Sequence, residues 1–138
     1  MKKLFIDTNI VLDLLAKREP FYESSAKLFT LSDRNAIQLS VSSLTFANTN
    51  YVLSKLKSAN EAKEILRKFK LLIQIVSLSE KIVDLALNDT AFKDFEDGLQ
   101  YYSAIESSQD VIITRNQKDF KSSLLSVMSA QEFLSSSS

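Results

Sequence analysis

Residues 3–15 read KLFIDTNIVLDLL and join an apolar run to a helical pattern through a polar step. The run Lys3–Ile6 is short and almost continuously apolar, which is typical of a buried parallel strand. Asp7 follows it directly. The next apolar positions recur with the period of a helix: Ile10, Val11, Leu14 and Leu15. The stretch predicts a strand, a polar turn and a short helix that stops before Pro20.

The alternation of strand and helix continues along the chain. Further apolar runs are predicted to be strands: Ile37–Val41, Ile73–Leu78, Val111–Ile113 and, more weakly, Leu124–Met128. Helical periodicity fills the intervals 21–32, 44–56, 60–70, 79–91 and 94–107. This order predicts a parallel sheet with helices on both faces and sites just beyond the carboxyl ends of the strands. At 138 residues we expect one domain, residues 1–134, with a serine-rich tail at 135–138.

The composition excludes several kinds of chemistry. The chain has no cysteine and no histidine, so thiol catalysis, zinc–thiolate sites and histidine-based acid–base catalysis are ruled out. Its single glycine excludes the glycine-rich loops that bind nucleotides. Any catalysis must therefore use carboxylates, hydroxyls, amides, lysines or arginines.

Charge and hydropathy further limit the class of protein to which the chain can belong. Seventeen basic residues balance seventeen acidic ones, so the chain lacks the overall positive charge of a protein that coats nucleic acid. Bound metal and a local basic rim could still hold a phosphodiester. No segment approaches the ~20 apolar residues of a membrane span, and an acid at residue 7 comes too early for a signal peptide. We expect a cytoplasmic protein.

Three aspartates occupy positions where strands and helices meet. Asp7 follows the first strand, and Asp119 lies shortly after a later one. Each could simply cap a helix or complete a turn. Asp97 shares the inward face of the helix 94–107, whereas Glu96 is turned about 100° toward solvent. No lysine or arginine on that inward face could pair with Asp97.

A metal ion would resolve the problem that these acids create. Carboxylates placed close together repel one another and raise each other's pKa values. A divalent cation removes the repulsion, and it can generate hydroxide for phosphodiester hydrolysis. The aspartates therefore favour an oxygen-ligated metal site, provided that the fold brings them together.

Three stretches resemble the opening, third and fourth acidic motifs of the PIN-domain ribonucleases: residues 6–13 (IDTNIVLD), residues 95–97 (FED) with Tyr101 to Ala104, and residues 114–116 (TRN) with Asp119-Phe120. The likeness runs from Lys3 to about Phe133. Residues 18–22 (REPFY) also resemble one bacterial branch of the family. Many bacterial members are toxins of the virulence-associated protein C type.

The resemblance implies a PIN-like three-layer α/β/α fold around a parallel sheet of four or five strands. It implies Mg²⁺ or Mn²⁺ at the acidic centre, cleavage of single-stranded RNA, an antitoxin partner and a homodimer. It assigns the metal to Asp7, Asp97 and Asp119, with Thr114 and Asn9 in support. One departure concerns the third helix, where Asn48 stands in place of the usual glutamate. Glu96 would partly compensate.

Basic and amide side chains near the same edge are candidates for contacts with substrate. Arg115 and Lys118 flank the last acidic motif and are predicted to contact phosphate, with Asn9 and Asn116 beside them. Two other functions stay open. A PIN-like module could bind RNA or protein without cutting, which Asn48 favours. An aspartate-based phosphotransfer domain fits poorly, because Asn9 stands where a second aspartate is required.

Overall fold

The computed structural model describes residues 1–136 of the 138-residue chain. Its centre is a five-stranded sheet in the order β3-β2-β1-β4-β5, and every neighbouring pair is parallel. The strands are β1 (Lys2–Ile6), β2 (Ile37–Ser42), β3 (Gln74–Val76), β4 (Val111–Ile113) and β5 (Ser126–Met128). All the predicted strands are present. The two outer strands, β3 and β5, are shorter than the apolar runs that predicted them.

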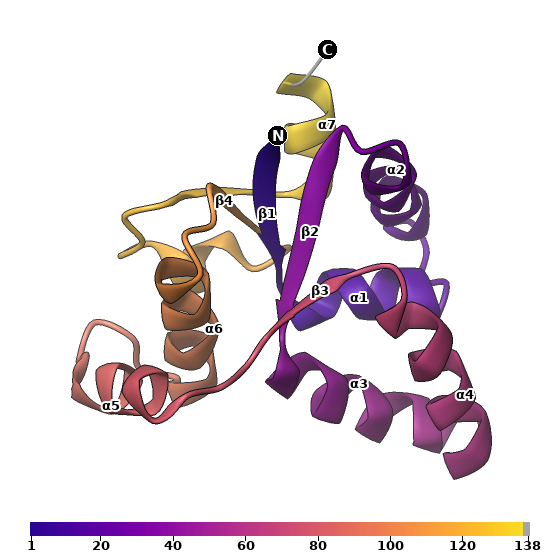
Figure 1. The fold of residues 1–138 in the computed structure, drawn as a ribbon, viewed down its shortest axis with the longest axis horizontal. Coiled ribbons are helices and arrows are strands. Elements are labelled where there is room, and N and C mark those ends of the chain that lie inside the picture. Colours follow the sequence, from indigo (N-terminus) through magenta and orange to yellow (C-terminus); the bar gives the residue numbers. More distant parts are fainter. Residues whose placement is uncertain (137–138) are drawn as a thin grey trace.

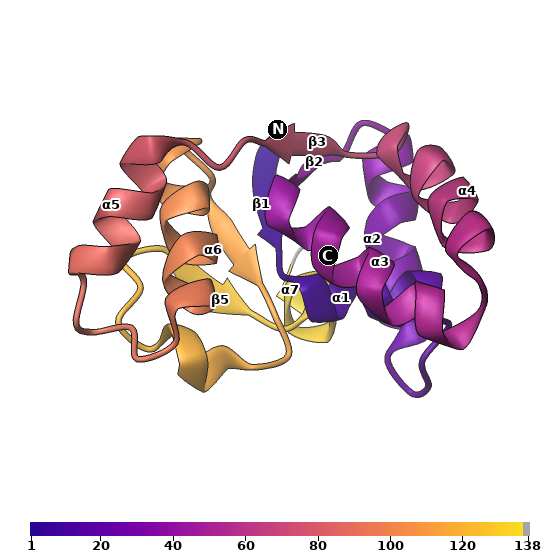
Figure 2. The same cartoon turned by 90° about the horizontal axis from the view of Figure 1, so that it is seen from below.

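Helices cover both faces of this sheet (Figure 1). They are α1 (Thr8–Leu15), α2 (Tyr22–Asp33), α3 (Ser43–Leu56), α4 (Ala59–Lys70), α5 (Glu80–Asn88), α6 (Phe95–Glu106) and α7 (Ala130–Ser136), with a short 3-10 helix η1 (Gln117–Phe120). In Figure 2, α5 and α6 lie on one side of the sheet and α1 to α4 on the other. The three-layer α/β/α fold expected from the resemblance is confirmed.

The central strand β1 contributes to the core on both of its faces. Leu4 and Ile6 pack with Leu28 of α2 and Phe69 of α4, while Phe5 packs with Tyr101 of α6. A strand buried on both faces needs apolar residues at every position, which explains the continuous run in the sequence.

The pairing of β1 with β4 determines where the polar residues gather. Ile6 lies opposite Ile113 in the parallel register, and the Asp7 backbone N–H donates to the Ile113 carbonyl at 2.9 Å. Asp7 and Thr114, the next residue of each strand, therefore emerge at the same edge of the sheet.

The last helix, α7, is absent from the sequence predictions. It packs through the buried Phe133 against the same core as β1. The domain boundary predicted at residue 134 falls inside this helix, because Ser135 and Ser136 are helical. Residues 137 and 138 of the predicted tail lie outside the described residues. The prediction of a single domain stays a prediction.

None of the helices formed by residues 1–136 combines the length and the apolar character that a membrane span requires.

Candidate active site

Asp7 is held in one orientation by its neighbours at the sheet edge. It caps α1, and its Oδ1 accepts a hydrogen bond from the Thr8 N–H at 2.8 Å. The buried Thr114 donates its hydroxyl to the other oxygen, Oδ2, at 2.8 Å. Asn9 Nδ2 donates more weakly to the same oxygen at 3.4 Å. The capping role anticipated for Asp7 is thus real, and it leaves the carboxylate fixed beside Thr114.

The surroundings of Asp7 act on its pKa in opposite directions. Burial raises the pKa, while the hydrogen bonds from Thr114 and Thr8 lower it. The negative charges of Asp119 and Glu96 raise it further, and the balance lies above the ordinary value. Asp7 therefore belongs to a group of acids that repel one another.

Asp97 is the second acid of this group whose pKa is raised. It lies in the first turn of α6 and is half-buried, whereas Glu96 is exposed, as the helical periodicity predicts. Burial is the main cause that raises the pKa of Asp97 to about 7, followed by the charges of neighbouring acids: Asp94, Asp119, Asp7 and Glu96. The structure thus brings Asp7, Asp97 and Asp119 within electrostatic range of one another. Among residues 1–136, none of the three forms a salt bridge with a lysine or arginine.

A pocket of 410 Å³ is lined by Asp7, Glu96 and Asp97. Its wall combines residues from α1, α3, α6 and the loops after α1 and β4: Asp7, Thr8, Asn9, Leu12, Arg18, Asn48, Tyr51, Val52, Glu96, Asp97, Gln100 and Asn116. Asp119 lies beside it on η1 and is exposed. The pocket is therefore acidic on the α6 side and amide-bearing and apolar on the α3 side.

Gln100 is a pocket residue that the sequence predictions missed. It is buried, and its Nε2 donates to the hydroxyls of Thr8 at 3.3 Å and Thr45 at 3.2 Å. Its Oε1 has no hydrogen-bond partner among residues 1–136. Gln100 lies three residues after Asp97, so helical spacing alone places it on the same face. That spacing could have identified Gln100 as a pocket residue. No comparable pattern in the sequence identifies Arg18 or Tyr51.

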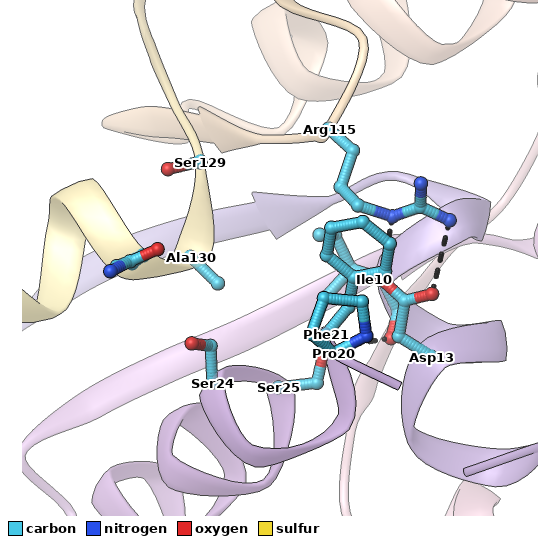
Figure 3. Close-up of a pocket in the computed structure, with 10 residues that line it drawn as sticks. Ile10, Asp13, Pro20, Phe21, Ser24, Ser25, Arg115, Ser129 and Ala130 are labelled. Carbon is cyan, nitrogen blue, oxygen red and sulfur yellow. Dashed lines mark hydrogen bonds and ion pairs between the residues drawn. The ribbon is translucent and has the colours of Figure 1, made fainter. Parts of the chain in front are cut away.

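Arg115 is turned away from the acidic pocket. Figure 3 shows its guanidinium against Asp13 and Phe21. It donates to both oxygens of the fully buried Asp13, at 2.8 and 3.1 Å, and lies 4.0 Å from the Phe21 ring centre. It lines a separate pocket of 340 Å³ with residues of α1, α2 and α7. Its charge is already paired, which argues against the predicted phosphate contact, whereas Arg18 does line the acidic pocket.

The other predicted substrate contacts divide in the same way. Asn9 and Asn116 line the pocket, as does Asn48, which stands at the position of the family's glutamate. Asn9 Nδ2 also donates to the Thr114 hydroxyl at 3.3 Å. Lys118 is exposed on η1 and does not line it. The roles of these residues stay predictions.

The donors present suit a divalent cation of the hard, oxygen-preferring kind. In the part of the chain that the structure describes, the carboxylates repel one another without a basic partner and the Gln100 carbonyl has no hydrogen-bond partner. These groups provide charge and a hydrogen-bond acceptor for a hydrated ion. Within residues 1–136, no three acidic side chains converge tightly enough to enclose an ion. Mg²⁺ does not require this, because it keeps several waters and typically binds one or two carboxylates.

A family model for the PIN domain matches residues 3–118 of the chain. The chain belongs to the PIN-domain family. This confirms the family resemblance carried by the acidic motifs. A curated relative named Ribonuclease VapC1, from Aquifex aeolicus (strain VF5), is 30% identical over 135 residues, which cover 96% of this PIN-domain chain and 93% of the relative.

Solved structures share the PIN-domain fold. The DNA-bound VapBC from Salmonella typhimurium matches with a TM-score of 0.73 at 17% identity, over 94% of this chain and 99% of that chain. VapBC2 from Rickettsia felis, bound to a DNA fragment from its promoter, matches with a TM-score of 0.69 at 22% identity, over 91% and 96% of the two chains. At these identities the likeness concerns the fold alone.

Proposed function

We propose that this PIN-domain chain is a metal-dependent endoribonuclease that cleaves single-stranded RNA. The observation that carries the proposal is that Asp7, Asp97 and Asp119 lie within electrostatic range of one another at one edge of the sheet. Within the described residues 1–136, none of the three has a lysine or arginine partner. The 30% identity to a relative named Ribonuclease VapC1, over nearly the whole chain, supports the same activity.

The cofactor in this proposal is Mg²⁺ or Mn²⁺, held by Asp7, Asp97 and Asp119 directly or through water. When bound, it supplies an activated water and charge stabilisation for phosphodiester hydrolysis. Thr114 and Thr8 keep the Asp7 carboxylate oriented, since both donate to it. Without metal the pKa of the Asp97 carboxyl is about 7, so near neutral pH this group would give up its proton as the cation binds. Gln100 Oε1 can accept a hydrogen bond from water in the pocket.

The partners in this proposal follow the relatives. Structures of the same fold are described as VapBC and toxin–antitoxin complexes. We therefore place the chain as the toxin of a toxin–antitoxin pair, acting in the cytoplasm as a homodimer.

Substitution of Asp7 tests the activity directly. Asp7→Asn keeps the shape of the side chain and removes its charge, so cleavage of a single-stranded RNA with Mg²⁺ or Mn²⁺ should fall roughly hundredfold or more. Asp84→Asn, at an exposed position on α5, is the matched control and should cleave like the wild type. Equal cleavage by Asp7→Asn and the wild type, with both folded by circular dichroism, would contradict the proposal.

A second candidate is a PIN-domain module that binds RNA or protein without cutting. The observation that favours it is Asn48, an uncharged amide that lines the pocket where the family's acid is expected. Under this alternative, RNA should bind and remain intact, and divalent metal should not stabilise the protein.

A further inference from the structure

The α3 side of the acidic pocket has a character different from that of the α6 side. Asn48, Tyr51 and Val52 line it, at helical spacings i, i+3 and i+4, and Lys55 follows one turn later on the same face. This face therefore offers an amide, an aromatic ring, an apolar side chain and a positive charge, all in one row.

The Tyr51 ring is exposed and contacts Lys55 of the next helical turn. The residue is 63% exposed although it is a large aromatic. Lys55 Nζ donates to its hydroxyl at 2.7 Å and lies 4.3 Å from the ring centre. A tyrosine side chain has only two rotatable bonds, so it loses little conformational freedom when a flat ligand stacks on its ring.

Two polar groups beside the ring can still bind a ligand, although Lys55 already uses one of its three donors on the Tyr51 hydroxyl. Among residues 1–136, no hydrogen bond engages the half-buried Asn48 side chain, and no salt bridge neutralises Lys55. Asn48 can both donate and accept, as the edge of a nucleobase requires. Lys55 can pair with a phosphate.

We propose that the Asn48–Lys55 face of α3 is the subsite for one unpaired nucleotide of the RNA, next to the phosphate that the acids address. The base stacks on Tyr51, its edge is read by Asn48, and its phosphate pairs with Lys55. This inference rests on the proposed ribonuclease function and adds how the substrate is recognised. Stacking on an aromatic platform requires an unpaired base, which accounts for a preference for single strands.

The size and charge of the pocket agree with this occupant. Its 410 Å³ falls within the range of small-ligand sites, roughly 300–1,000 Å³. The acidic α6 side repels phosphates unless a cation is bound, so the base and its phosphate favour the α3 side. The net charge of zero means that affinity must come from such local contacts.

A fluorescent base provides the test. A single-stranded RNA that carries one 2-aminopurine is titrated with the chain bearing Asp97→Asn, which stops cleavage under the proposed function. The chain has no tryptophan, so protein fluorescence interferes little. Stacking should quench the 2-aminopurine. Tyr51→Phe should retain quenching and affinity, whereas Tyr51→Ala should abolish quenching and weaken binding roughly five- to hundredfold.

Two further substitutions separate the contacts. Lys55→Ala should lower the steepness with which affinity falls with salt by about 0.7 in the log–log slope, as expected for one lost phosphate contact. Asn48→Ala should reduce the differences in affinity among unlabelled RNAs that carry A, C, G or U at the position that the 2-aminopurine occupied. Leu56→Ala, exposed on the same helix and outside the pocket, is the control and should change neither.

The outcomes distinguish this inference from the activity on which it rests. If the wild type cleaves RNA but Tyr51→Ala binds and quenches like the control, the subsite is overturned and the nuclease survives; a protein contact would then be the remaining use of Tyr51. If quenching requires Tyr51 but no RNA is cut, the subsite is supported and the nuclease fails.

Discussion

The raised pKa of Asp97 makes the stability of the fold depend on pH. Its pKa is about 7 in the folded chain against 3.8 for an unperturbed aspartate, mainly because of burial and then because of the acids around it. Between these pH values the folded state holds a proton that the unfolded state has lost, so folding is favoured on the acid side. This contribution is complete below pH 3.8 and is lost as the pH rises through about 7.

We therefore predict that, in EDTA, the free energy of unfolding decreases between pH 5 and pH 8 by more in the wild type than in Asp97→Asn. Urea unfolding at a series of pH values measures the difference. Asp84→Asn should follow the wild-type profile, because Asp84 is exposed and remote from the pocket. Parallel profiles for the wild type and Asp97→Asn would show that Asp97 titrates normally.

The positions of some site residues could be predicted from the sequence, and those of others could not. Asp7 and Thr114 could be placed together because each follows a strand, and parallel neighbouring strands end at one edge. Tyr51 could not be assigned to the pocket, since that depends on where α3 lies relative to α6 across the edge of the sheet. Arg115 shows the converse: a basic residue next to an acidic motif is turned away because the buried Asp13 requires a partner.

At the level of elements, the Asp13–Arg115 pair joins α1 to the loop after β4. Asp13 is fully buried on α1, and it pairs with Arg115, which directly follows Thr114 in the chain. The Arg115 backbone N–H also donates to Asn9 Oδ1 at 3.3 Å. The pair therefore fastens the loop that carries Thr114 against the helix that Asp7 caps.

Breaking this pair should destabilise the fold. Arg115→Met leaves the Asp13 charge buried with Arg18, at 3.8 Å, as its one remaining basic partner among residues 1–136. We expect a loss of ~2–4 kcal/mol in the free energy of unfolding, measured by urea denaturation, because an uncompensated buried charge is costly. Arg34→Met, at an exposed position, should change it by less than about 0.5 kcal/mol. A loss no larger than that of the control would mean that the pair contributes nothing.

The elements were largely predictable because their patterns are periodic. The helices α1 to α6 and all five strands appear close to the predicted ranges. The helix α7 was missed because its serine-rich end masks the pattern, although Ser129 and Glu132 form a reciprocal capping box at 2.9 and 3.0 Å. Its stability comes from packing of Phe133 into the core, which a local pattern does not reveal.

At the scale of the whole molecule, we expect a divalent metal bound in the acidic pocket to increase the free energy of unfolding. The cation would relieve the repulsion among Asp7, Asp97 and Asp119 in the folded state, while the unfolded chain offers no such site. Binding at one hundred times Kd adds about 2.7 kcal/mol. For a chain of this size, that corresponds to a rise of roughly 5–10 °C in Tm.

We therefore predict that Mn²⁺ or Mg²⁺ raises the Tm of the wild type relative to EDTA, measured by differential scanning calorimetry. Asp7→Asn should lose most of this rise, whereas Asp84→Asn should keep it. Because the metal binds ionised carboxylates, the rise should be larger at pH 8 than at pH 6. If the wild type binds RNA but neither ion raises its Tm, the acids do not bind a cation. The chain would then be the PIN-domain module that binds without cutting, the alternative that Asn48 favours.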